Sequence, residues 1–248
     1  MAERLLGYPL AFDLPERVRA FQTTRRGGVS APPWDTLNLG THVGDDPAAV
    51  AANRARVVEA AALPAAPVYL EQVHGTAVVD LGGVVQGKVP QADAAVAFEP
   101  GRVAVVLTAD CLPVLFADRH GTRVAAAHGG WRGLTAGVLE ATVAALDCPP
   151  ASLLAWIGPG IGAAHYEVGP EVVAAVRERH PFAAAAVAET GDTSRLHLAQ
   201  YAASVLAYLG VDTVTAADTC TAGEPALWFS YRRDGTTGRQ GAFIWIEP

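Results

Sequence analysis

Residues 108–130 read TADCLPVLFADRHGTRVAAAHGG and carry the pattern of a β-hairpin. Two apolar segments flank a short polar break that ends in glycine. A turn centred near Arg119 or His120 places Cys111 opposite His128 on the neighbouring strand. Directly opposed residues of an antiparallel pair have Cβ atoms about 5 Å apart and point to the same face of the sheet. The sequence therefore predicts that this thiol and this imidazole are neighbours.

Further strands and helices are predicted on both sides of the hairpin. Segments rich in β-branched residues and bounded by Gly or Pro cover residues 17–24, 67–75, 77–81, 93–98, 102–111, 152–158 and 241–248. Helical patterns cover residues 47–62, 134–146, 170–179 and 196–209. Because the helices interleave with the strands without strict alternation, we expect an α+β fold with a mixed sheet.

The composition of the 248-residue chain excludes several classes of partner. Hydrophobic residues make up 51% and charged residues 17%, which is typical of a compact globular protein. The net charge is −7 and no run of Lys or Arg exceeds two residues, so we expect no nucleic-acid partner. No apolar run approaches the roughly 18 residues of a membrane span. The amino terminus is a poor signal peptide and the three cysteines are few, so we expect a cytoplasmic protein.

Three residues form the pattern of a metal site. His74 and His128 each end a strand-like segment and are followed at once by glycine, which lets ligands approach the backbone. Cys111 lies just before Pro113, where regular strand pairing ends. Two imidazoles and one thiolate without a fourth protein ligand are typical of catalytic zinc, which keeps one position open. A Cys111 nucleophile with His128 as its base would need the same geometry, and the spacing leaves both interpretations open.

The other histidines and cysteines carry weaker signals. His120 in the turn and His180 before a proline are expected on the surface, in contact with water, and His197 is expected to have no ligand role. Cys148 and Cys220 have no evident partner, and we expect them to be buried thiols.

Seven motifs in order along the chain resemble the YfiH family, formerly called DUF152 or the laccase-domain family. They are TTRRGGVS, NLGTHVGDDPAAVAANR, QVHG, TADCLPVLF, AAHGGWRGL, YEVG and WFSYRRDGTTGRQGAFIWI. The resemblance implies one domain over residues 1–248, of the α+β class with mixed β-sheets flanked by helices. It also implies a metal bound by His74, Cys111 and His128. One departure is visible, because the family usually has alanine at the position of Gly129.

The resemblance implies three different activities. One is a zinc-dependent purine nucleoside enzyme that deaminates adenosine and cleaves purine nucleosides with phosphate. The second is a cytoplasmic hydrolase that edits peptidoglycan precursors with the same site. The third, a laccase-type polyphenol oxidase, is disfavoured, because multicopper sites use many histidines in His-x-His pairs. This chain has seven histidines and no such pair. Copper could still occupy the zinc site adventitiously. A metal-binding module without activity is a further alternative.

Deamination needs a carboxyl group to carry protons. Asp110, next to Cys111, is the nearest candidate in the sequence. Neighbours on a regular strand face opposite sides, so Asp110 is also a candidate for orienting a backbone group or a histidine.

The substrates implied by the resemblance are small molecules, a purine nucleoside and phosphate, bound by a monomer or a homodimer. Phosphate requires cationic or amide donors. The candidates for phosphate are Arg26, Arg132 and Arg232. The candidates for ribose or base are Asn38, His42 and Gln72, each of which could instead cap a loop.

Overall fold

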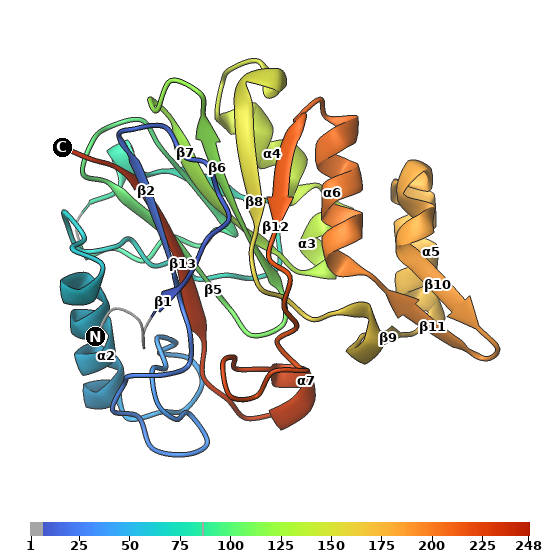
Figure 1. The fold of residues 1–248 in the computed structure, drawn as a ribbon, viewed down its shortest axis with the longest axis horizontal. Coiled ribbons are helices and arrows are strands. Elements are labelled where there is room, and N and C mark those ends of the chain that lie inside the picture. Colours follow the sequence, from blue (N-terminus) through green and yellow to red (C-terminus); the bar gives the residue numbers. More distant parts are fainter. Residues whose placement is uncertain (1–6, 86) are drawn as a thin grey trace.

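The computed structural model describes residues 7–85 and 87–248, and its largest sheet has six strands (Figure 1). Their order is β12-β8-β6-β7-β4-β3, with a parallel pair at each edge and antiparallel pairs between them. The strands are β3 (Val78–Asp80), β4 (Ala94–Ala97), β6 (Leu112–Asp118), β7 (Val124–Gly129), β8 (Leu153–Ile157) and β12 (Thr213–Ala216). The predicted hairpin is strands β6 and β7, at the centre of this sheet.

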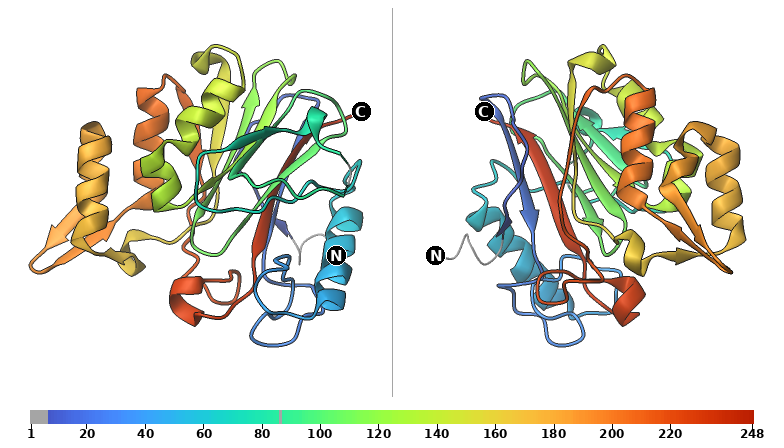
Figure 2. Two further views of the ribbon diagram at one scale, coloured as in Figure 1. Left: turned by 180° about the vertical axis from the view of Figure 1, so that it is seen from behind. Right: turned by 45° about the vertical axis from the view of Figure 1, so that its right-hand side comes forward.

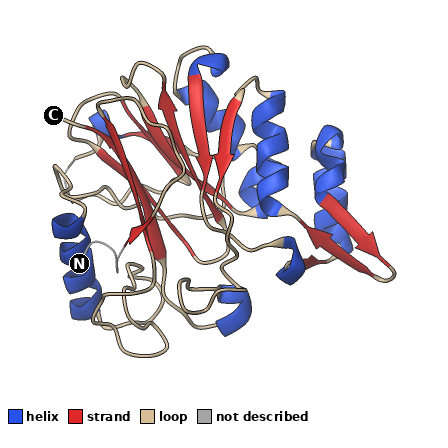
Figure 3. Ribbon diagram, in the orientation of Figure 1, coloured by secondary structure: helices blue, strands red, loops and turns tan. Residues whose placement is uncertain are grey.

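A second sheet of four antiparallel strands packs against the first (Figure 3). Its strands, in spatial order, are β1 (Gly7–Tyr8), β2 (Val18–Thr23), β13 (Gln240–Ile246) and β5 (Val103–Thr108). On β5, Ala104 and Val106 face the six-stranded sheet, whereas Val103 and Val105 belong to the core on the opposite face. Both faces of this strand are buried, which explains why its sequence is an unbroken apolar run.

Helices cover the outer faces of the two sheets (Figure 2). Helix α2 (Pro47–Ala60) packs on the four-stranded sheet through Val57. The opposite face of the six-stranded sheet is covered by α3 (Trp131–Ala136), α4 (Val138–Ala145) and α6 (Leu198–Tyr208). Each helix thus buries one apolar side against a sheet. This arrangement confirms the predicted α+β class with mixed sheets flanked by helices.

Smaller elements extend from this sandwich. Helix α5 (Pro170–Arg179) lies beside a three-stranded sheet of β9 (Glu167–Val168), β11 (Thr193–Leu196) and β10 (Val187–Thr190). The remaining helices are short: η1 (Leu81–Gly83), η2 (Pro150–Ser152), η3 (Ala163–His165), η4 (Pro181–Ala186) and α7 (Tyr231–Asp234). Within residues 7–85 and 87–248, no helix combines the length and apolar character needed to cross a membrane.

The register of the central hairpin differs from the prediction by two residues. His128 pairs with Pro113, not with Cys111, which lies just before β6 begins. The Asp118 carboxylate accepts hydrogen bonds from the backbone N–H groups of Thr122 and Arg123, which stabilises a longer turn than predicted. A shift of two residues preserves the face of each side chain. Cys111 and His128 therefore still point to the same side of the sheet.

Two segments differ from the predicted secondary structure. The predicted helix 134–146 begins earlier, at Trp131, and is divided into α3 and α4 by Gly137, whose φ of 105° ends the first helix. The predicted strand 67–75 is irregular apart from single bridges at Val68 and Glu71. Side-chain hydrogen bonds hold this segment in place of a strand ladder.

The prediction of a water-exposed His180 is wrong. Its side chain is buried, with Nδ1 2.7 Å from the Tyr201 hydroxyl and Nε2 3.0 Å from Glu140 Oε1. The proline that follows begins η4, which packs against α5 and α6 and covers the imidazole. His120 is exposed, as predicted, and His197 caps the start of α6.

Candidate metal centre and pocket

The side chain of Asp93 organises the predicted metal site. It lies just before β4, is fully buried, and accepts a hydrogen bond from His128 Nδ1 over 2.8 Å. It also accepts hydrogen bonds from the backbone N–H groups of Val73, His74 and Gly75, at 3.1, 2.9 and 2.7 Å. Burial raises the pKa of Asp93, but the hydrogen bonds from His128, Gly75 and Val73 lower it overall. One carboxylate therefore fixes both predicted histidine ligands.

The orientation of His128 follows from this hydrogen bond. His128 is the penultimate residue of β7 and has only 4% of its surface exposed. Because Nδ1 faces Asp93, the other ring nitrogen, Nε2, is left for a ligand. A carboxylate behind a metal-binding imidazole is a recurring arrangement that fixes the ring and its tautomer.

His74 is presented by the irregular segment that Asp93 holds. Its backbone has a φ of 61°, a conformation that costs free energy for a residue with a side chain. The three hydrogen bonds to Asp93 compensate for this strain. Its ring lies 4.7 Å from the ring of His128, centroid to centroid, and its Nε2 lies 3.7 Å from Cys111 Sγ.

Cys111 sits in the turn between β5 and β6, directly after Asp110, which has a φ of 96°. Burial alone would raise the pKa of the Cys111 thiol. The charge of His128 and hydrogen bonds to both histidines oppose burial and lower this pKa to about 6. Burial likewise disfavours the charged form of His128, but Cys111 and Asp93 raise its pKa to about 9. Both shifts have the same cause, because the thiolate form of Cys111 and the charged form of His128 stabilise each other.

The donor set fits a metal ion. One ligand atom from each of His74, Cys111 and His128 lies within 4.8 Å of the other two. In the part of the chain that the structure describes, this is the one group of three or more potential ligands that meets this condition. Thiolate and imidazole are the ligands that zinc and copper prefer, and three protein ligands leave a position open.

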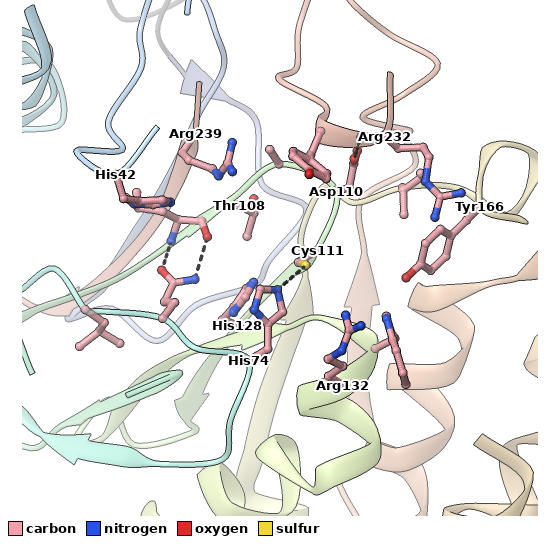
Figure 4. A pocket seen from close by; sticks show the side chains of 17 residues that line it. His42, His74, Thr108, Asp110, Cys111, His128, Arg132, Tyr166, Arg232 and Arg239 are labelled. Carbon is pink, nitrogen blue, oxygen red and sulfur yellow. Dashed lines mark hydrogen bonds between the residues drawn. The ribbon is translucent and has the colours of Figure 1, made fainter. Parts of the chain in front are cut away.

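A cavity of about 410 Å³ opens directly onto these three residues (Figure 4). Its lining includes five further residues predicted for the site. These are His42, Gln72, Asp110, Arg132 and Arg232. The structure thus brings eight of the predicted site residues, from distant segments of the chain, to one cavity.

Two predicted substrate residues do not line this cavity. Arg26 is exposed, and its Nε donates a hydrogen bond to the Ala226 carbonyl over 2.7 Å. Asn38 is buried, and its side chain bonds Gly40 and the backbone N–H of Arg239. Both residues act as loop anchors, which was the alternative that the sequence left open for Asn38.

Asp110 and Gln72 line the cavity but already have protein partners. Asp110 accepts hydrogen bonds from the Thr221 hydroxyl and from the backbone N–H of Arg232, both at 2.6 Å. Gln72 exchanges two hydrogen bonds of 2.8 Å with the backbone of Leu107. These contacts tie the carboxyl-terminal segment and the His74 segment to strand β5. Both side chains thus hold neighbouring segments in place, and their predicted roles toward a substrate stay predictions.

Sequence reasoning missed Asp93, Tyr166 and Arg239. Asp93 opens an otherwise apolar strand, and a lone aspartate at that place is a usable signal for a buried role. Tyr166 and Arg239 line the cavity and lie in the YEVG and TGRQG motifs quoted above. No spacing rule links residue 239 to residue 111, because strand β13 reaches β5 only through the tertiary fold.

Comparison with known proteins finds relatives over nearly the whole chain. A family model described as multi-copper polyphenol oxidoreductase laccase matches residues 19–247. A protein of Shigella flexneri named purine nucleoside phosphorylase YfiH is 50% identical over 233 residues, which are 94% of this chain and 96% of that protein. A Pseudomonas aeruginosa protein, also named purine nucleoside phosphorylase, is 47% identical over 235 residues, with 94% and 95% covered.

Solved structures share the whole fold. Neisseria meningitidis protein NMB0706, described as DUF152, matches with a TM-score of 0.93 and 45% identity over 98% of this chain and 99% of that one. A Bacillus licheniformis protein described as hypothetical protein YfiH matches with a TM-score of 0.87 and 28% identity, covering 96% and 99%. Family model, relatives and structures agree, and the chain belongs to the YfiH family of laccase-domain proteins.

Proposed function

We propose that this chain is a zinc-dependent purine nucleoside phosphorylase that also deaminates adenosine. The observation that carries the proposal is the cluster of His74, Cys111 and His128 at a cavity lined by arginine and aromatic side chains. The names of the Shigella and Pseudomonas relatives support the phosphorylase activity. Deamination, the identity of the metal and a cytoplasmic location go beyond those names and belong to this proposal.

The proposed zinc would be held by the two imidazoles and the thiolate. When bound, zinc supplies Lewis-acid chemistry and lowers the pKa of a coordinated water. Asp93 keeps His128 oriented and holds the segment that carries His74 next to it. The arginines supply positive charge for an anionic co-substrate, and the aromatic side chains supply flat apolar surface for a base.

Phosphorolysis transfers the ribosyl group from the purine to phosphate. An oxygen of phosphate forms a bond to the anomeric carbon while the bond from that carbon to the purine nitrogen breaks, and the purine takes up a proton. Asp110 is proposed to position Arg232 in the cavity wall through its backbone hydrogen bond. A role of Asp110 in proton transfer stays a prediction.

A competing hypothesis is a hydrolase that uses Cys111 as its nucleophile. The depressed pKa of Cys111 and the raised pKa of His128 favour it, because a thiolate beside an imidazolium is the reactive form of such a pair. That hypothesis predicts activity after removal of metal. The zinc hypothesis predicts loss of activity.

The test combines metal analysis with a nucleoside panel. Purified protein is expected to contain one zinc per chain, to convert adenosine to inosine, and to release hypoxanthine from inosine only when phosphate is present. Treatment with a chelator should abolish both reactions, and added zinc should restore them. Zinc-loaded protein that leaves all purine nucleosides unchanged would contradict the proposal. Full activity after chelation would favour the Cys111 nucleophile.

A further inference from the structure

The cavity has two cationic ends, with Cys111 between them. In Figure 4, His42, Thr108 and Arg239 lie on one side of Cys111, and Tyr166 and Arg232 lie on the other side. Both ends therefore present positive charge, but their side chains differ in what they already contact. Because of this difference, we expect the two ends to bind different parts of the substrates.

Arg239 is held rigidly at its end of the cavity. Its Nη1 donates hydrogen bonds to the carbonyls of Thr237 and Gly238, at 3.1 and 3.0 Å. Its aliphatic stem packs on Gly40, where an added Cβ would lie only 2.8 Å from Arg239 Cγ. The guanidinium is thus fixed before any ligand arrives, which reduces the entropy lost on binding.

In the described part of the chain, Arg239 makes no direct contact with a carboxylate. Within residues 7–85 and 87–248, Arg239 forms no ion pair, and its Nε and Nη2 have no hydrogen-bond partner. Arg25 and Arg233, in contrast, pair with Asp35 and Asp234. Burial lowers the pKa of Arg239 although the charges of Cys111, Asp110 and Tyr231 oppose it, which agrees with a guanidinium partly removed from water. A fixed cation with free donors is a site for an anion.

The neighbours of Arg239 suit a small oxyanion. Thr108 pairs across the sheet with Gln240, so its hydroxyl lies near the start of β13, where Arg239 is located. His42 lies close enough to Arg239 for that charge to contribute, after burial, to lowering the pKa of His42. A hydroxyl, a neutral imidazole and two guanidinium nitrogens together offer several hydrogen bonds to phosphate oxygens.

The opposite end is built from aromatic rings. The Arg232 guanidinium lies 5.1 Å from the ring centroid of Tyr166 and donates to the Glu167 carbonyl over 2.9 Å. The Arg132 guanidinium lies 4.5 Å from the ring of Trp131. These arginines are already engaged with aromatic faces. Flat rings backed by guanidinium groups are suited to stacking with a purine.

We propose that Arg239, with His42 and Thr108, forms the subsite for the phosphate co-substrate, and that the purine lies at the Tyr166 end. This inference rests on the proposed phosphorylase function and divides its cavity into two subsites. Phosphate and nucleoside would then approach the centre of the cavity from opposite sides, on either side of Cys111.

The test compares Arg239→Gln with the matched variant Arg232→Gln from the other end, both in zinc-loaded protein. Binding of inorganic phosphate is measured by calorimetry, and the KM values for phosphate and inosine are measured separately. Loss of a charged hydrogen-bond donor corresponds to roughly a 10- to 100-fold change in affinity. Arg239→Gln is expected to weaken phosphate binding and raise the KM for phosphate by this factor. Arg232→Gln should act mainly on the KM for inosine.

Arg239→Lys is a conservative control in case Arg239→Gln fails to fold. It retains the charge but not the forked donors, so we expect phosphate affinity between those of wild type and Arg239→Gln. Zinc content and melting temperature are recorded for each variant. Unchanged phosphate affinity in Arg239→Gln, a larger loss in Arg232→Gln, or no phosphate binding by wild type with or without inosine would overturn the subsite. A wild type that binds phosphate through Arg239 but cleaves no nucleoside would contradict only the proposed function.

Discussion

Two buried carboxylates flank the candidate metal centre and organise different parts of it. Asp93, beside β4, binds three consecutive backbone amides and one imidazole. Asp110, beside Cys111, binds one hydroxyl and one backbone amide from the carboxyl-terminal segment. Asp93 therefore supports the metal ligands, whereas Asp110 supports the wall of the cavity. The comparison shows that proximity in sequence to a ligand does not reveal which carboxylate orients it.

The largest expected effect is that of Asp93→Asn. The NH₂ group of asparagine would face the hydrogen-bond donors that the carboxylate now accepts from. The His128 imidazole or one of the backbone N–H groups would then be buried without an acceptor. We expect metal affinity to fall by about 100-fold, at the upper end of effects for residues behind a ligand. The free energy of unfolding should fall by about 3 kcal/mol, because buried groups lose their partner. Competition with a chromophoric chelator and denaturant titration measure the two effects.

Asp80→Asn is a matched control for that variant. Asp80 is exposed, and its carboxylate accepts a single hydrogen bond from the backbone of Gly82. Metal affinity in this variant should equal that of wild type. If Asp93→Asn binds metal as tightly as Asp80→Asn, then Asp93 does not organise the ligands.

The pH dependence of metal affinity also distinguishes the roles of Asp93 and Asp110. Metal binding requires Cys111 as thiolate and His128 as neutral imidazole. With pKa values of about 6 and about 9 in the metal-free protein, binding between these pH values releases the proton of His128. Affinity should therefore rise about tenfold per pH unit up to pH 9 and then level off, and below pH 6 it should fall more steeply.

Asp93 contributes to the raised pKa of His128, so Asp93→Asn should move the upper limit of this rise to lower pH. Asp110→Asn should leave the limit where it is in wild type. Chelator competition between pH 5.5 and 9.5 gives both curves. An affinity independent of pH in wild type would show that the thiolate–imidazolium pair does not form.

A smaller effect is expected for Asp110→Asn. The asparagine oxygen can still accept one of the two hydrogen bonds that Asp110 accepts. The cavity wall should therefore loosen without loss of metal. We expect a rise of about tenfold in the KM for the nucleoside, equivalent to one lost hydrogen bond. A fall in kcat of about 1,000-fold at unchanged zinc content would instead identify Asp110 as the proton carrier.

The smallest effect is expected for Gly129→Ala, which restores the residue usual in the family. A Cβ at this position would lie 3.3 Å from Leu112 Cβ and O, a tight contact that a small shift relieves. We expect stability to change by less than about 1 kcal/mol. At Gly130 the added Cβ would lie 2.8 Å from His74 Cδ2 and 3.0 Å from Cys111 Sγ. Gly130→Ala should therefore reduce metal affinity, and the pair of variants tests how closely the ligands are packed.

The sequence predicted those parts of the fold that local patterns determine. Helix α5 occurs at the predicted residues, and the central hairpin brings Cys111 near His128. The register was wrong because the side chain of Asp118 stabilises a four-residue turn. The prediction of a strand over residues 67–75 was wrong because long-range hydrogen bonds to Asp93 and Leu107 replace strand pairing. Such contacts have no periodic signature in the chain.

In the candidate site, too, the residues with a local signal were predicted, and those placed by long-range contacts were not. The three ligands were predicted from glycines next to histidines, from hairpin geometry and from family motifs. The arginines were harder to assign, because Arg26 and Arg232 each lie in an Arg–Arg pair but have different positions in the fold. Arg26 bonds a distant loop, whereas Arg232 lines the cavity. Only the pairing of β13 with β5 brings Arg239 to the same cavity.

The full burial of Asp93 has a consequence for the charge of the centre. A divalent ion bound by one thiolate and two neutral imidazoles carries a net charge of one, and the Asp93 carboxylate behind His128 cancels it. Viewed from the cavity, the metal centre is then close to electrically neutral. The long-range attraction of an anionic co-substrate must come from Arg132, Arg232 and Arg239. Association should therefore depend on ionic strength through these arginines, and hardly on which divalent metal is bound.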